Sequence, residues 1–230
     1  MTNVKDEYPS LGQSGFGFDF LTNDYKVVRI VDLYPVNYIC PKRGQRSQED
    51  EMNPHRGKRS QVDAIYSLKN DSWRKFDDKS LSVICGIKCY SRTYTTNNNK
   101  GILSWLGNDT YAEIIASFDM NEEVMFTTPI PDDSVIGSYE ETFRSLSAVN
   151  ECVALIVYPL TKFYDRCWDV WVLHEYGVKK PWTNLYTVER IPGVERALGF
   201  WKNNELLLED KLGQLFLHCP ITEEKVNPSG

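Results

Sequence analysis

Residues 15–31, GFGFDFLTNDYKVVRIV, alternate large apolar side chains with small or polar ones near the start of the chain. A phenylalanine occupies every second position from 16 to 20, which is the period of a β-strand because successive side chains point to opposite faces. Four turn-forming residues follow, and then a β-branched and aromatic run. The pattern predicts a hairpin with Gly15 and Gly17 inside its first strand. A dinucleotide-binding loop is not indicated, because the third glycine is missing and a strand pattern continues after the second.

The unit of strand, short polar turn and second strand recurs along the chain. It is found in AIYSLKNDSWRKF (64–76), IASFDMNEEVMF (115–126), VWVLHEYGVKKPWTNLYTV (170–188) and LFLHCPITEEKV (215–226). Four aligned positions in these segments are 52, 54 and 45 residues apart, namely Tyr66, Phe118, Val172 and Leu217. A second series of short apolar strands lies between them, in DYKVVRIV, GILSWLG, CVALIVY and ELLLED. Each unit therefore has about four strands, and no long amphipathic helix interrupts them.

Four-stranded antiparallel units at steps of roughly 50 residues predict an all-β fold of the β-propeller class, with the period of kelch-type blades. We expect about four blades, which make an incomplete ring, and strand in more than about 40% of the chain. The alternative is a large β-sandwich, which also consists of short strands at regular spacing.

The segment 35–60 interrupts this spacing, and from Pro41 it is almost entirely polar. Its six basic and three acidic residues give it a net charge of +3, whereas the rest of the chain carries −9. Such a composition buries too little apolar surface to order itself, so residues 41–60 are expected to form a flexible insertion. Two interpretations remain open, a solvated spacer and a recognition loop. For the second, the candidate partner-binding residues are Lys42, Arg43, Arg46, Glu49, Asp50, Glu51, Arg56, Lys58 and Arg59. The irregular segment 127–139 is a further candidate for the binding surface.

The chain has 230 residues, a net charge of −6 and a pI near 5.2. This balance argues against a general nucleic-acid binder and favours basic partners. Without a run of about eighteen apolar residues no membrane span is predicted. The first thirteen residues lack the apolar core of a signal peptide, so the six cysteines are not expected to form a disulfide framework.

Catalytic chemistry is not indicated by any motif. The three histidines lie far apart in sequence, and the paired carboxylates are adjacent residues whose side chains point to opposite faces of a strand. We therefore expect no catalytic residue, no metal ligand and no cofactor, and the chain is not predicted to be an enzyme. The tryptophans near strand ends are expected to pack between blades rather than to bind a ligand. They are Trp73, Trp105, Trp171, Trp182 and Trp201.

Five motifs in this order closely resemble the kelch-like F-box-associated domain of plant F-box proteins. They are GFGFDFLTNDYKVVRIV, IYSLKNDSWRKF, IASFDMNEEV, VWVLHEYGVKKPWTNLYTV and LGFWKNNELLLE. The resemblance covers residues 15–226, between expected tails at 1–14 and 227–230. The inserted loop and the late motifs look most like the S-locus F-box branch, which acts in self-incompatibility.

The resemblance implies a protein-binding module that recognises the target of a Skp–cullin–F-box ubiquitin ligase. In the S-locus branch that target is a pistil ribonuclease, so a basic ribonuclease is one expected partner. An F-box is not found before residue 15, and binding to the Skp adaptor is expected only from a longer form. A cytoplasmic and also nuclear location is implied. The alternative functions are a propeller-fold enzyme and a lectin-like glycan binder.

Overall fold

The computed structural model describes residues 7–35, 59–76, 88–97, 100–108, 112–138, 141–159, 167–178, 182–189, 191, 193–201, 204–220 and 225–226. These residues form four sheets of four strands, and within each sheet the strands pair antiparallel in chain order.

Each sheet is one meander of consecutive strands. Sheet 1 contains β1 (Glu7–Asp19), β2 (Asp24–Pro35), β3 (Arg59–Ser67) and β4 (Ser72–Lys75). Sheet 2 contains β5 (Lys88–Asn97), β6 (Ile102–Asn108), β7 (Glu113–Asp119) and β8 (Val124–Pro129). Sheet 3 contains β9 (Thr142–Val149), β10 (Cys152–Pro159), β11 (Trp168–Leu173) and β12 (Trp182–Val188). Sheet 4 contains β13 (Val194–Phe200), β14 (Leu206–Asp210), β15 (Leu215–His218) and β16 (Lys225–Val226). One helical turn, α2 (Asp133–Ile136), connects sheets 2 and 3.

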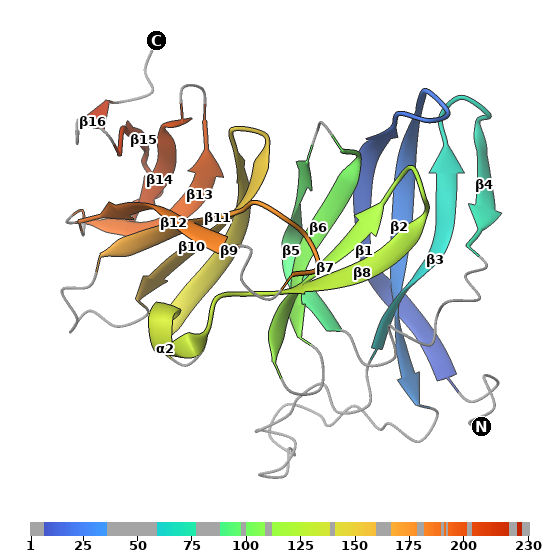
Figure 1. Ribbon diagram of the computed structural model, residues 1–230, viewed down its shortest axis with the longest axis horizontal. Helices are drawn as coiled ribbons and strands as arrows, with labels where there is room; N and C mark the ends of the chain where they lie inside the picture. The colour runs from blue at the N-terminus through green and yellow to red at the C-terminus, as the bar shows by residue number, and fades with distance from the viewer. Residues whose placement is uncertain are drawn as a thin grey trace.

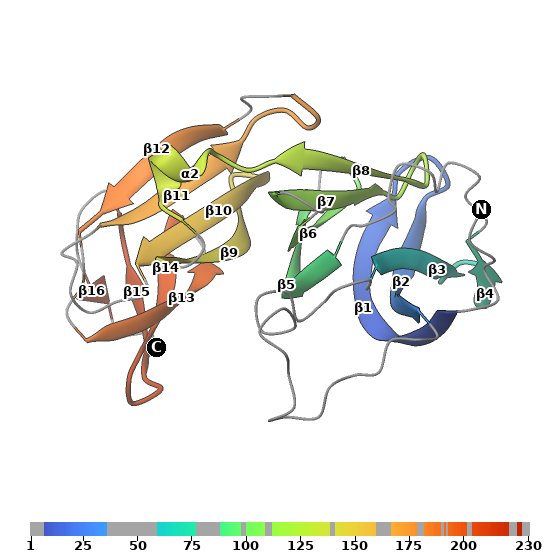
Figure 2. The ribbon, with the colours of Figure 1, turned by 90° about the horizontal axis from the view of Figure 1, so that it is seen from below.

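The four sheets follow one another along an arc, with sheets 1 and 4 at its two ends (Figures 1 and 2). The first strand of each sheet lies beside the first strand of the next, so that β1 contacts β5, β5 contacts β9 and β9 contacts β13. This is the arrangement of propeller blades, whose first strands lie nearest the axis of the ring. The predicted propeller-like fold is confirmed, and a two-sheet sandwich is excluded.

Three hydrophobic clusters hold the arc together, one between each pair of successive sheets. Strand β10 shows why the inner strands read as continuous apolar runs. Its Ala154 and Ile156 belong to the cluster shared with sheet 4, whereas Val153 and Leu155 belong to the cluster shared with sheet 2. Because both faces of the strand are covered, the period-two alternation of a half-buried strand disappears.

The hairpin at residues 15–31 is confirmed, with β1 and β2 joined by a turn at residues 20–23. Its two glycines have a packing role. A methyl group at Gly15 would lie 2.6 Å from Leu103 Cδ1 and 2.7 Å from Trp105 Cζ2, and one at Gly17 would lie 3.1 Å from Met120 Cε. These glycines allow β1 to approach sheet 2 closely, which is the use of glycine in a strand that packs against another backbone.

The predicted repeat corresponds to the sheets strand by strand. The four hairpin segments are β3–β4, β7–β8, β11–β12 and β15–β16, the third and fourth strands of each sheet. The second apolar series consists of the second strands β2, β6, β10 and β14. Two predicted boundaries differ from the structure. Strand β1 begins at Glu7 instead of residue 15, and residues 59–60, assigned to the insertion, begin β3 by pairing with Leu33 and Asp32.

The tryptophan prediction is correct for Trp105 and wrong for two others. Trp105 is fully buried between sheets 1 and 2. Trp73 is 54% exposed on β4 and Trp201 is 57% exposed after β13, so neither fills space between blades. Trp171 and Trp182 are partly buried against the cluster between sheets 2 and 3, as expected.

Candidate functional site

The irregular segment after β8 forms the short turn α2 against the edge of sheet 3. Pro131 precedes the turn, and the Asp132 carboxylate accepts a hydrogen bond from the Ser134 backbone N–H at 2.8 Å. Gly137, at φ 82°, ends the turn. Ile136 is buried in the cluster between sheets 2 and 3, which fixes α2 to the sheets. Hydrogen bonds from Ser134 hold the pKa of Asp132 below its ordinary value.

A groove of about 460 Å³ lies between α2 and one end of sheet 3. Its walls come from α2, the start of β9, the end of β10, the start of β11 and the end of β12. Three carboxylates line it, those of Asp133, Glu141 and Asp169, and the described lining residues include no lysine, arginine or histidine. The groove is therefore negatively charged and suited to a cationic group.

The floor of the groove is apolar and is formed by Ile136 of α2 and by Val157 and Pro159 at the end of β10. The Tyr158 side chain lies on the opposite face of sheet 3, where its ring stacks on that of Trp168 with centroids 4.9 Å apart in the cluster shared with sheet 4. Burial raises the pKa of the Tyr158 hydroxyl, so the side chain is neutral at physiological pH. An apolar floor with carboxylates at the rim fits a long basic side chain, whose stem is apolar and whose head carries the charge.

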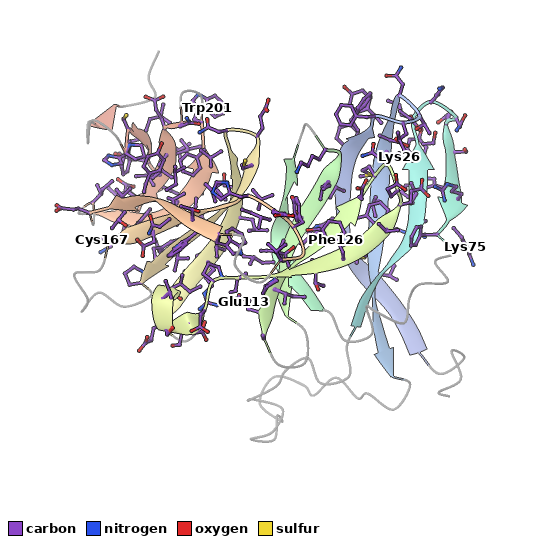
Figure 3. All side chains as sticks on the ribbon, in the orientation of Figure 1. Lys26, Lys75, Glu113, Phe126, Cys167 and Trp201 are labelled. Atoms are coloured by element: carbon purple, nitrogen blue, oxygen red, sulfur yellow. The ribbon has the colours of Figure 1, made fainter. Side chains whose placement is uncertain are left out.

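Arg144 fixes the position of one of these carboxylates. Its guanidinium is buried and pairs with Glu113 of β7 and with Asp133 of α2, the latter at 2.7 Å. It also donates to the Gly137 carbonyl at 2.5 Å. Burial raises the pKa of Glu113, although the charge and hydrogen bond of Arg144 oppose this effect. The arginine thus joins sheet 2, α2 and sheet 3 at one point next to the groove. Its partner Glu113 lies near α2 in Figure 3.

The carboxylate of Asp169 is held from the neighbouring strand. It accepts hydrogen bonds from the Thr187 hydroxyl at 2.8 Å and from the Asn184 side-chain amide at 3.1 Å. Both donors lie on β12, which pairs with β11. The Asp169 side chain is therefore oriented before any ligand binds.

A second charged cluster joins sheets 1 and 2 at their other end, away from Glu113 (Figure 3). Lys26 Nζ lies 2.5 Å from Asp19 Oδ2 and 2.7 Å from Glu123 Oε1, and it donates to the Met120 carbonyl at 3.2 Å. Burial alone would raise the pKa values of both carboxyls, but their hydrogen bonds and the Lys26 charge outweigh it and lower them. Each charge has a partner inside the protein, so this cluster holds two sheets together and is not a ligand site.

The two predicted binding segments differ in how much of them the structure describes. Segment 127–139 supplies α2 and one wall of the groove, and its role as a binding surface stays a prediction. Of the residues proposed in the insertion, Arg59 begins β3, and the rest lie outside the described residues: Lys42, Arg43, Arg46, Glu49, Asp50, Glu51, Arg56 and Lys58. Glu141 and Asp169 were not anticipated, because 28 positions separate them in sequence and only the pairing of β9, β10 and β11 brings their strands side by side.

Groups of three or more histidine, cysteine, aspartate or glutamate side chains that could hold a metal ion are not found among the described residues. In the same part of the chain, no helix is long and apolar enough to cross a membrane. His174 and Gly177 lie in the turn between β11 and β12.

The chain is similar in sequence to several F-box proteins of one plant. The chain is 24% identical to F-box protein CPR1 of Arabidopsis thaliana over 79% of its own length and 41% of that protein. It is 26% identical to F-box protein At3g07870 over 83% of the chain and 45% of the relative. It is 25% identical to F-box/kelch-repeat protein At3g23880 over 89% of the chain and 48% of the relative. The chain therefore spans less than half the length of these relatives.

A family model gives the wider match. The model of the F-box associated beta propeller domain matches residues 2–227. This range contains all four sheets and the groove. The chain belongs to the F-box associated beta propeller domain family.

Proposed function

We propose that this chain is a protein-binding module that recognises the target of a Skp–cullin–F-box ubiquitin ligase, and that a basic segment of the target binds in the groove beside α2. The observation that carries the proposal is the groove itself, with three carboxylates at its rim and no basic side chain among its described lining residues. The family match and the F-box names of the relatives support the ligase context.

The geometry suits recognition of a lysine or arginine side chain. The apolar stem of such a residue would cover Val157 and Pro159, and its charged head would reach the carboxylates of Glu141 and Asp169. Hydrogen bonds between ionised partners are the stronger ones, roughly twice as strong as neutral ones. Asp133 contributes less, because Arg144 already neutralises much of its charge.

The finer parts of the proposal follow from the resemblance in sequence. A basic ribonuclease would match the acidic groove, and a role in self-incompatibility would follow for a member of the S-locus branch. The charged residues of segment 41–60 would supply a second contact on the same target. Contact with the Skp adaptor would come through an F-box in a longer form, and the whole assembly would act in the cytoplasm and nucleus.

The groove proposal is tested by affinity capture from plant extract with a variant and a matched control. The double variant Glu141→Lys with Asp169→Asn reverses one charge and removes another, while the side-chain oxygen that remains at position 169 can still accept from Thr187. The control Glu122→Lys changes an exposed carboxylate in the turn between β7 and β8, at the end of sheet 2 far from α2.

We expect the unaltered chain and the control to retain the same proteins from the extract. The groove variant should bind these proteins at least about tenfold more weakly, which corresponds to a loss of about 1.4 kcal/mol in binding free energy. The retained proteins should dissociate as salt screens the charges. Capture of the same proteins in equal amounts by all three forms would show that the groove does not bind the target.

A further inference from the structure

The fourth strand of each sheet forms its outer edge, where one row of backbone N–H and C=O groups faces away from the sheet. Such an edge pairs readily with another extended chain. Proteins protect it with short strands, charged side chains, proline or a covering segment. In this chain the outer strands are β4, β8, β12 and β16.

Three of these edges carry such protection in the described part of the chain. Strand β4 has four residues, and two of them are Arg74 and Lys75. Strand β16 has two residues, and one of them is Lys225. Strand β8 ends at Pro129, whose carbonyl accepts a hydrogen bond from the Trp182 indole N–H at 2.7 Å.

Strand β12 lacks these features. Its sequence WTNLYTV has seven residues, with no charged side chain and no proline. Its backbone pairs with β11 on one side and has no partner among the described residues on the other. Thr183, Asn184, Leu185 and Thr187 are exposed. Because β-branched and aromatic residues favour extended backbone, this edge is both well formed and open.

The open edge stands on the flank of the arc. Sheets 2 and 4 cover the two faces of sheet 3, and β12 lies on the side of sheet 3 opposite β9 (Figure 2). A propeller is extended by further sheets beside its first or last sheet. The outer edge of sheet 3 therefore stays open wherever the chain begins or ends.

The one irregularity of β12 connects this edge to the groove. Leu185 has no partner on β11, because the register shifts by one residue at this point. Asn184 and Thr187 consequently both reach the Asp169 carboxylate, although they are three positions apart. Thr187 and Asp169 line the groove. Bulges redirect side chains in this way next to binding sites, so the open edge and the groove meet at the end of β12.

We propose that an extended segment of the target adds to sheet 3 as a fifth strand beside β12, with a basic residue of the same segment in the groove. Because that residue enters the groove, this inference rests on the proposed function. In strand addition the main-chain hydrogen bonds supply affinity, and side-chain pockets supply specificity. The occupant is an uncharged extended segment with a lysine or arginine at one end, since the edge is uncharged and the groove carries three carboxylates.

The position of the groove sets the order of residues in this segment. Strand β12 pairs antiparallel with β11, like the other strand pairs within the sheets, and an antiparallel partner of β12 begins at the groove end. A residue opposite Thr187 lies two strand spacings, about 10 Å, from Asp169 on the same face of the sheet. An arginine or lysine side chain extends toward the carboxylate over that distance. The basic residue therefore precedes the extended residues in the target sequence.

The probe for this mode is the fluorescein-labelled peptide SRVTVTVTS, and its binding to the whole chain is measured by fluorescence anisotropy. One derivative carries N-methyl groups on the valine amides and another on the threonine amides. These two sets of amides face opposite edges of a strand, and an N-methyl group prevents pairing only at the edge that meets β12. We expect one derivative to bind at least about tenfold more weakly than the unmodified peptide and the other to bind equally well.

Substitutions in the protein test the same contact from the other side. Leu185→Pro should weaken binding of the unmodified peptide at least about tenfold, because proline removes a main-chain donor and opposes pairing at an edge. Leu185→Ala is the matched control and should bind normally. The groove variant Glu141→Lys with Asp169→Asn should also weaken binding, and a probe with glutamine in place of arginine should not distinguish that variant from the unaltered chain. The methylated peptides give a result even where Leu185→Pro does not fold.

The outcomes separate strand addition from binding in the groove. Equal binding of all three peptides, lost in the groove variant, would show that the segment uses the groove alone and would overturn strand addition. Binding weakened by methylation but unchanged in the groove variant would support the pairing with β12 and contradict the groove proposal. A probe that does not bind at about 1 mM would overturn strand addition. So would self-association of the unaltered chain that Leu185→Pro abolishes, because a second copy would then occupy the edge.

Discussion

The substitution Gly15→Ala tests how closely β1 approaches sheet 2. The added methyl group would lie 2.6 Å from Leu103 Cδ1 and 2.7 Å from Trp105 Cζ2, about 1 Å closer than carbon atoms normally approach. Both neighbours are fully buried, so neither can move without displacing others. Overpacking of this kind costs about 1–3 kcal/mol, and the rigid surroundings favour the upper half of that range. The substitution also restricts the unfolded chain, which returns about 0.4–1 kcal/mol. The net expectation is a loss of about 2 kcal/mol.

The measurement is urea unfolding, monitored by tryptophan fluorescence. We expect the slope of the transition to be unchanged and its midpoint to lie at a lower urea concentration. The adjacent residue provides the control, because Phe16 points away from sheet 2 and is 46% exposed, so Phe16→Ala should cost less than about 1 kcal/mol. Shortening Leu103 to alanine should relieve part of the overlap, so the double variant should lose less than the sum of the single losses. A loss below about 0.5 kcal/mol for Gly15→Ala would refute the close approach of the two sheets.

Three further predictions concern the charged clusters and the exposed tryptophan. Arg144→Met should lower the free energy of unfolding by about 3–5 kcal/mol, because Glu113 is left buried without its cation. Glu113→Gln should lower the free energy of unfolding by less. Equal losses for the two variants in urea melts would contradict the prediction. The pKa of Asp19 lies below its ordinary value of 3.8, so its contribution to stability is present above that pH and is lost as the pH falls below it. Lys26→Met should reduce this acid-dependent loss of stability. An unchanged pH profile of stability in that variant would contradict the role of the cluster. Trp73→Ala should lower the free energy of unfolding by less than about 1 kcal/mol, because the side chain is 54% exposed. A loss above about 3 kcal/mol in denaturant melts would mean that the ring is buried.

Most of the fold could be predicted from the sequence because each sheet is built from local contacts. The hairpin segments and the apolar second strands are contiguous in sequence, and their turns carry residues that tolerate a left-handed backbone. Asn150 and Glu151, for example, have φ of 46° and 63° between β9 and β10. A repeat of such units indicates blades even before the contacts between them are known.

Contacts between sheets were harder to predict, since they depend on which face of a strand meets a neighbour. Trp73 illustrates this, because its sheet is the first of the arc and its side chain lies on the face that no other described sheet of the chain covers. Arg144 and Glu113 are 31 positions apart, and no sequence pattern identifies them as an ion pair. The groove has the same origin: Asp133 was visible as part of an irregular acidic segment, but Glu141 and Asp169 join it only through strand pairing.

Hydrogen–deuterium exchange of the chain with and without a captured target tests the central claim most directly, because it locates the bound partner on the structure. The account predicts slower exchange in α2, at the start of β9 and at the start of β11, and no such change for the variant Glu141→Lys with Asp169→Asn. Protection confined to other elements, with α2 and these strand ends unchanged, would contradict it.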